Sequence, residues 1–195
     1  MNVNDSQVSR IARRHLDDSL RVLAPDEEPT PFIVAAGPHG MKHIGLHCLA
    51  DHDFAETART VIPAFIVFGE AVEVALAAFT NAPGICGGTP ECAFIAHWGP
   101  RSRGLFTSAV TRRNTQPPVI GGWLTGPAWA DLGPVDEGVR SGMEMAHRLW
   151  DTDADDLRQR IDNIRSAAGT TDNDVLPLTV DALREWGWLG LTPGR

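Results

Sequence analysis

Lysine is nearly absent from this 195-residue chain, and tyrosine is missing altogether. Lys42 is the only lysine, so neither "GICGG" (84–88) nor "GPHG" (37–40) contains the lysine of a Walker loop. These glycine-rich stretches also lack the G-x-G-x-x-G order of a dinucleotide-binding loop. The sequence therefore predicts neither ATP binding nor dinucleotide binding, and we expect no cofactor.

Positive charge is also scarce. The 25 acidic residues outnumber the 17 basic ones and give a net charge of −8, so the chain as a whole repels polyphosphates. We therefore expect no nucleic-acid partner. Four arginines still gather on a predicted hairpin, where they either face solvent or serve an acidic ligand: Arg101, Arg103, Arg112 and Arg113.

A long apolar run without charges is missing as well. The nearest candidate, "VIPAFIVFGEAVEVALAAF" (61–79), contains Glu70 and Glu73 near its middle and Pro63 near its start. Each carboxylate would cost about 2–3 kcal/mol or more in hydrocarbon, so we expect this run to be protein core and no membrane partner. The polar start "MNVNDSQVSR" lacks the blocks of a signal peptide, which predicts a cytoplasmic location.

Cysteine is too rare for a disulfide framework. The three cysteines, Cys48, Cys86 and Cys92, are an odd number in a chain of this length, so we expect thiols. Cys86 and Cys92 have C-x5-C spacing, which differs from the C-x2-C of zinc knuckles and thioredoxin-like motifs. Either the loop between them brings the two sulfurs together, or Cys92 is simply a buried strand residue.

The remaining composition, 43% apolar and 22% charged, is that of an ordinary folded soluble protein. The fold class that we expect is α+β. We expect a mostly antiparallel sheet with a packed helix, an N-terminal helix and a C-terminal helical extension. Three segments follow: 1–30 as helix and connection, 31–127 as the sheet core, and 128–195 as the extension. The predicted elements, from apolar periodicity, are a helix at 6–23, a hairpin at 32–49, a helix at 54–62, strands at 64–69, 92–98 and 104–112, a short edge strand near Trp123, and helices after 134.

Residues 71–80 fit two patterns. Val72, Leu76 and Phe79 have helical spacing, whereas Val74 between them continues a strand alternation. We favour a strand through Val74 and leave the rest open.

Histidines cluster in "MKHIGLHCLADHDF" (41–54), which raises the question of a metal site. On a strand, His43 and His47 would stand about 13 Å apart, because each residue advances the chain by about 3.3 Å. One ion cannot bind both. A metal would therefore need one of them with ligands from elsewhere, and the candidate set is His43, His47, His97 and Cys48.

Tryptophan is over-represented, with six residues and no tyrosine. Four tryptophans lie in loop-like or terminal settings, where large rigid rings serve either partner binding or the sealing of a helical extension onto the sheet. The predicted interface residues are Trp123, Trp129, Trp186 and Trp188.

Over residues 30–125, the apolar strands "AFIVFGEAVEV", "ECAFIAHW" and "GLFTSAVTRR" give the chain a pattern that resembles uncharacterised α+β proteins of actinobacteria and their phages. This resemblance implies an α+β module with an added helical tail, encoded by a phage or other mobile element. It transfers no functional residue to this chain.

No G-x-S-x-G elbow or other complete catalytic constellation is present in the sequence. We therefore predict a non-enzymatic protein-binding or assembly module that binds a protein partner or associates with itself. The alternative is a small metal-dependent hydrolase that uses the histidine and cysteine cluster.

Overall fold

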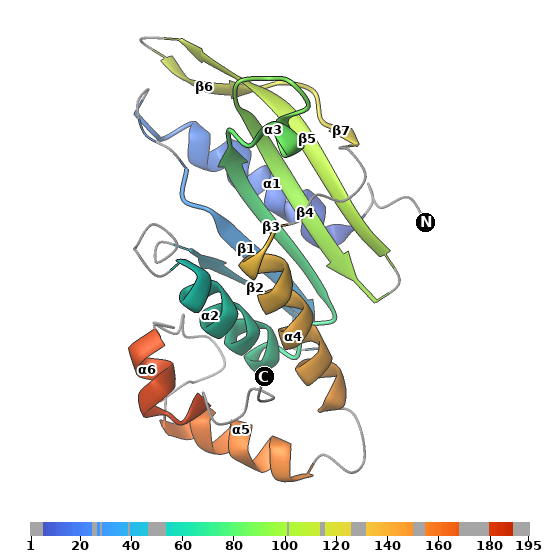
Figure 1. Ribbon diagram of the computed structural model, residues 1–195, viewed down its shortest axis with the longest axis vertical. Helices are drawn as coiled ribbons and strands as arrows, with labels where there is room; N and C mark the ends of the chain where they lie inside the picture. The colour runs from blue at the N-terminus through green and yellow to red at the C-terminus, as the bar shows by residue number, and fades with distance from the viewer. Residues whose placement is uncertain are drawn as a thin grey trace. The chain divides into compact units, whose positions relative to one another are not determined.

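A computed structural model describes residues 6–24, 27, 29–38, 40–46, 54–100, 102–113, 116–125, 132–149, 155–167 and 180–188. The fold is α+β, with a mostly antiparallel sheet, an N-terminal helix and C-terminal helices, which confirms the predicted class (Figure 1). The chain divides into two compact units. The sheet unit comprises Met1–Ala35, Met41–His47 and Glu73–Asp131, and the helical unit comprises Ala36–Gly40, Cys48–Val72 and Leu132–Arg195.

The three-segment domain division stays a prediction. In space, the N-terminal helix belongs to the sheet unit and the helix at 54–68 belongs to the helical unit.

The strands of the sheet follow the order β2-β1-β3-β4-β5-β6, and β7 also pairs with β5. Their bounds are β1 Phe32–Gly37, β2 Gly40–Gly45, β3 Glu73–Thr80, β4 Cys92–Gly99, β5 Ser102–Arg113, β6 Gln116–Ile120 and β7 Leu124–Thr125. The predicted hairpin is confirmed over 32–45, and the predicted antiparallel strands at 92–98 and 104–112 are confirmed with it. Residues 73–80 are strand throughout, which settles the ambiguous stretch.

Register places side chains on two faces of the central strands. Ala77 pairs with Ile95, which pairs with Phe106, and the next row joins Ala78, Phe94 and Thr107. Because cross-strand partners point to the same side of a sheet, these two rows mark opposite faces. We call them the Phe106 face and the Phe94 face.

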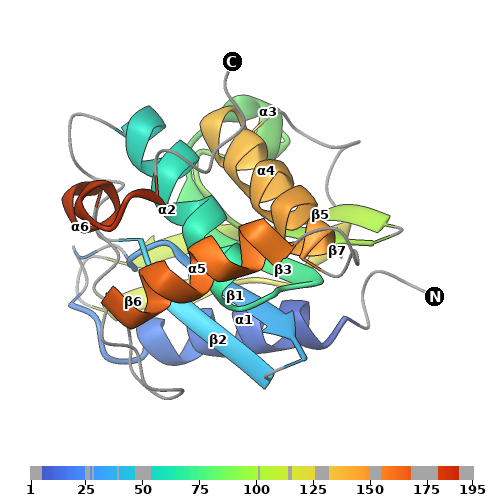
Figure 2. The same cartoon turned by 90° about the horizontal axis from the view of Figure 1, so that it is seen from below.

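Helix α1 (Gln7–Leu20) covers the Phe106 face. Ser6 caps its start, since the Ser6 hydroxyl accepts a hydrogen bond from the Ser9 amide at 3.4 Å. Its buried stripe faces the sheet, and the helix contacts β3, β4 and β6 (Figures 1 and 2). The stripe consists of Val8, Ser9, Ala12, Leu16 and Leu20.

The strand predicted at 64–69 is wrong, because α2 runs without a break from Phe54 to Phe68. Every residue from 61 to 69 is buried, so the apolar run shows no helical period. Pro63 lies inside the helix. A short apolar run that starts beside a proline and is buried on all sides cannot be told from a buried strand by pattern alone.

Helix α4 (Pro134–Arg148) packs closely on α2 through two glycines, Gly138 and Gly142. A Cβ atom added at Gly138 would collide with the backbone oxygen of Ala58, and one added at Gly142 would lie 2.8 Å from the Cα of Pro63. Both clashes involve backbone atoms that cannot move aside cheaply. The spacing of α2 and α4 therefore depends on the missing side chains.

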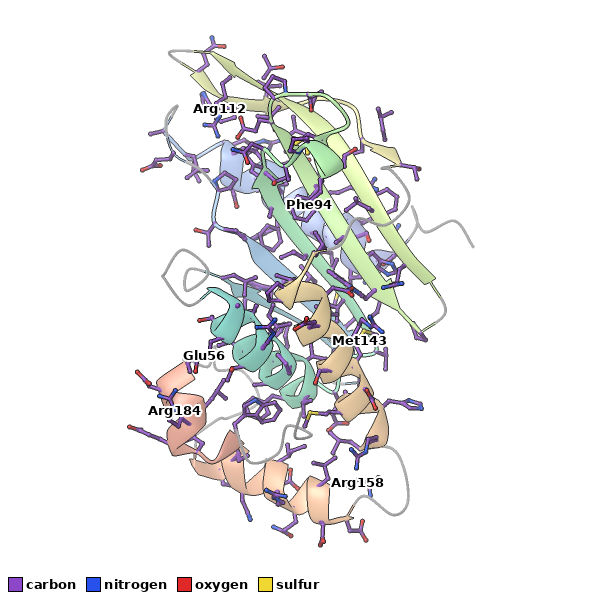
Figure 3. All side chains as sticks on the ribbon, in the orientation of Figure 1. Glu56, Phe94, Arg112, Met143, Arg158 and Arg184 are labelled. Carbon is purple, nitrogen blue, oxygen red and sulfur yellow. The ribbon has the colours of Figure 1, made fainter. Side chains whose placement is uncertain are left out.

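The C-terminal helices are α5 (Asp155–Ala167) and α6 (Val180–Glu185), which confirms the prediction of helices after 134. Helix α6 contacts α2, and Arg184 points toward Glu56 with its Nη2 atom 3.3 Å from Oε1 (Figure 3). Trp188 is fully buried, with its ring 5.5 Å from the Phe68 ring in an edge arrangement.

Within the described residues, no helix is both long and apolar enough to cross a membrane.

Replacing Gly138 with alanine is expected to lower the free energy of unfolding by about 1–3 kcal/mol, because α2 and α4 must move apart. Gly84→Ala is the control, since it also lies in a helix but has open space around its Cα. Urea unfolding should show the loss in Gly138→Ala and a change within about 0.5 kcal/mol in Gly84→Ala. Equal stability of the two variants would contradict this account of the helix contact.

Candidate protein-binding edge

The strands β6 and β7 form one edge of the sheet, and both pair antiparallel with β5. Val119 pairs with Thr111, and Leu124 pairs with Thr107. Thr107 lies on the Phe94 face, and Thr111 is four residues further along the same strand, so Val119 and Leu124 lie on that face too.

These two side chains are unusually exposed for apolar residues. Leu124 is 69% exposed and Val119 is 54% exposed. Ala109, between Thr107 and Thr111 on the same face of β5, is exposed as well. Single exposed apolar residues are common, whereas apolar residues that gather on one face of a sheet form a candidate interaction surface. We call Ala109, Val119 and Leu124 the edge patch.

An aromatic and cationic stack lies behind the edge patch, on the Phe106 face. The guanidinium carbon of Arg13 on α1 is 4.8 Å from the centre of the Phe106 ring and 5.5 Å from the centre of the Trp123 ring. Burial lowers the pKa of Arg13, and Asp17 partly opposes that shift. The side chain remains a cation between two ring faces, and it ties Trp123, which directly precedes Leu124, to α1.

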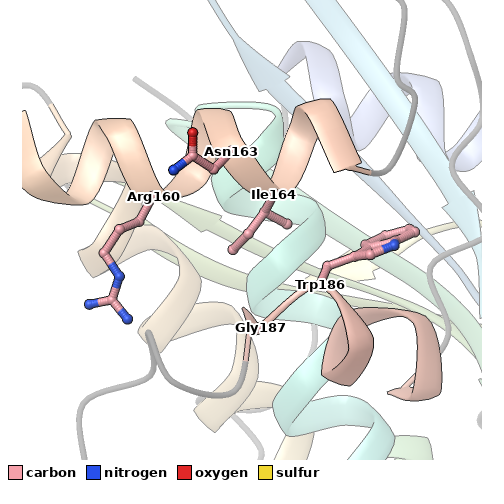
Figure 4. A pocket seen from close by; sticks show the side chains of 5 residues that line it. All are labelled: Arg160, Asn163, Ile164, Trp186 and Gly187. Carbon is pink, nitrogen blue, oxygen red and sulfur yellow. The ribbon is translucent and has the colours of Figure 1, made fainter.

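The four predicted interface tryptophans lie in different settings, and their role stays a prediction. Trp123 is half-buried beside the edge patch, whereas Trp188 is in the core of the helical unit. Trp186 is half-buried and, with Gly187, lines a shallow cavity of about 230 Å³ against α5 (Figure 4). Trp129 lies outside the described residues.

The candidate metal ligands do not gather in the part of the chain that the structure describes. His43 is exposed on β2, with its ring 5.4 Å from the ring of His15, and His97 is buried on β4. His47 and Cys48 lie outside the described residues. Among the described histidine, cysteine, aspartate and glutamate residues, no group of three or more could hold a metal ion.

His97 instead pairs with Glu73. The imidazole is 2% exposed, and its Nε2 atom lies 2.7 Å from the Oε1 atom of Glu73 on β3. Ala75 is the direct cross-strand partner of His97, so Glu73 reaches the ring from the diagonal position on the same face. Arg112, one of the four arginines on the predicted hairpin, pairs with Glu91.

No protein-family model, curated protein or solved structure matches this chain.

The buried His97–Glu73 pair predicts a specific stability order. Glu73→Ala should lower the free energy of unfolding by about 1–3 kcal/mol, because it leaves the buried Nε2 atom without a partner. Glu73→Gln keeps a polar group at hydrogen-bond distance and should lose less. Urea unfolding of the two variants at one pH measures the difference, and a Glu73→Ala variant as stable as Glu73→Gln would show that the pair contributes little.

Proposed function

We propose that this protein is a non-enzymatic assembly module that associates with a second copy of itself through the edge patch. The observation that carries the proposal is the joint exposure of Val119 and Leu124 on one face of the two strands that pair with β5 at this edge. Burying both side chains on association would stabilise the dimer by about 25 cal/mol for each Å² of apolar surface removed from water.

The sequence of β6 favours contact through side chains over the addition of a strand. Pro117 and Pro118 have no backbone N–H and so cannot donate hydrogen bonds to a neighbouring strand. Prolines at this position are a common defence against edge-to-edge pairing. The apolar face beside them stays open, so a partner would dock on Val119 and Leu124.

The net charge opposes contact between two copies everywhere except at uncharged surface. Each chain carries a net charge of −8, so two copies repel each other over most approaches. The edge patch and the two threonines beside it, Thr107 and Thr111, carry no charge, so a contact here meets the least repulsion. A symmetric dimer also needs only one self-complementary surface. Because the patch is small, we expect a weak, concentration-dependent dimer.

The proposal predicts that one charge in the patch weakens association strongly. Sedimentation velocity over a range of concentrations should show a dimer for the wild-type protein and at least about a tenfold weaker dimer for Leu124→Asp, since a buried unpaired carboxylate costs more than about 1.4 kcal/mol.

Val22→Asp is the matched control, because Val22 is an 84% exposed apolar residue just after α1 and outside the patch. It adds the same charge to the chain and should dimerise like the wild-type protein. A wild-type protein that stays monomeric at all concentrations, or a Val22→Asp variant weakened as much as Leu124→Asp, would overturn the proposal.

The proposal extends to the setting of the protein: a cytoplasmic location, and an origin in an actinobacterial phage or other mobile element, as the resemblance implies. The genes on either side of its coding sequence would test that origin.

A further inference from the structure

Cys86 and Cys92 lie together at the start of β4. Cys86 ends the short helix α3 (Pro83–Cys86), and the two cysteines are 6% and 1% exposed. The Cys86 thiol donates a hydrogen bond to the backbone oxygen of Thr80 at 3.2 Å. Thr80 is the direct cross-strand partner of Cys92, so this one residue brings the two cysteines together, and Cys86 is near enough to raise the pKa of Cys92.

The connection between them is held in shape at both ends. Gly87 and Gly88 turn the chain with positive φ angles of 58° and 96°. The Thr89 hydroxyl then contacts the backbone oxygens of both Cys86, at 2.9 Å, and Glu91, at 3.3 Å.

Glu91 itself is fixed to β5. Its carboxylate accepts two hydrogen bonds from Arg112, of 2.8 and 2.7 Å, in the bidentate arrangement that gives the strongest pairing. Because the residue before Cys92 is anchored in this way, the two thiols meet in a preformed geometry instead of by chance motion of a loop.

We propose that Cys86 and Cys92 are a modification site for peroxides, at which the two thiols are converted into a reversible intramolecular disulfide. A disulfide requires two cysteines that can meet with little backbone movement. The direct contact with Thr80 and the pinned connection meet that requirement.

The reaction balances with hydrogen peroxide as the oxidant. The sulfur of Cys86 attacks one peroxide oxygen and the O–O bond breaks. The second oxygen departs as water with the thiol proton, and Cys86 becomes a sulfenic acid. The sulfur of Cys92 then attacks the Cys86 sulfur, the S–O bond breaks, and the Cys92 proton leaves with the hydroxide as a second water. Two thiols and one peroxide give one disulfide and two waters.

Two features assign the first step to Cys86. Cys86 is followed by the exposed glycines Gly87 and Gly88, whereas Cys92 lies within the sheet. Burial, the neighbouring Cys86 and Glu91 raise the pKa of Cys92 to about 12. Cys92 is therefore a protonated thiol at neutral pH and attacks only after Cys86 has been oxidised. Such a pair responds to sustained oxidant and does not act as a fast peroxidase.

Proteases that cut after lysine, arginine and glutamate can test whether the disulfide joins these two cysteines. Trypsin releases residues 60–101 as one peptide with both cysteines, and it places Cys48 in a separate peptide, 43–59. After hydrogen peroxide treatment and alkylation, we expect peptide 60–101 unalkylated and lighter than its reduced form by two hydrogens. A glutamate-specific protease cuts after Glu91, between the two cysteines, and the halves should stay joined until dithiothreitol separates them.

Linkage of either cysteine to Cys48 or to a second chain, irreversible sulfonic acid without linkage, or two thiols that remain alkylatable would each overturn the proposal. The Cys92→Ala variant adds a second readout, because its Cys86 should stop at a sulfenic acid that dimedone traps. Cys48→Ala is its control and should form the disulfide like the wild-type protein. The peptide map of the wild-type protein stands even if Cys92→Ala fails to fold.

Discussion

The seating of α1 on an alanine-lined face of the sheet is the contact on which the sheet unit depends. Ala75 and Ala77 of β3 and Ala93 of β4 are fully buried on the face that carries Phe106. Small side chains there let a helix approach closely. Because α1 lies so near the sheet, Arg13 reaches the Phe106 ring and holds Trp123 in turn. A helix at one end of the sequence thereby positions the far edge of the sheet.

Much of this fold could be predicted where one side of an element faces water. The amphipathic pattern of α1 and the paired strands β4 and β5 were clear from the sequence. The start of α2 was predicted correctly, but its second half was predicted as a strand, because residues 61–68 are all buried and a segment without an exposed side has no period to detect. It also missed β6, since Pro117 and Pro118 argue against a strand except at an edge.

The sites depend on register, which spacing along the chain does not contain. Glu73 and His97 are far apart in sequence, and only the β3–β4 pairing puts them on one diagonal. Val119 and Leu124 could not be predicted from spacing either, because only the pairing of β6 and β7 with β5 puts them on one face. Trp123 could be singled out from composition, but its stacking partner on α1 could not. The two cysteines could be identified as a possible pair from the sequence, but their spacing did not show whether the sulfurs meet.

Pro117 and Pro118 also bear on how this protein behaves when crowded. Open sheet margins tend to recruit further chains without limit, and the product is a fibril. The two prolines hinder that growth because they cannot donate hydrogen bonds to an added strand. The side chains beside them can still contact another molecule. The same short segment thus disfavours growth of a fibril from this edge of the sheet.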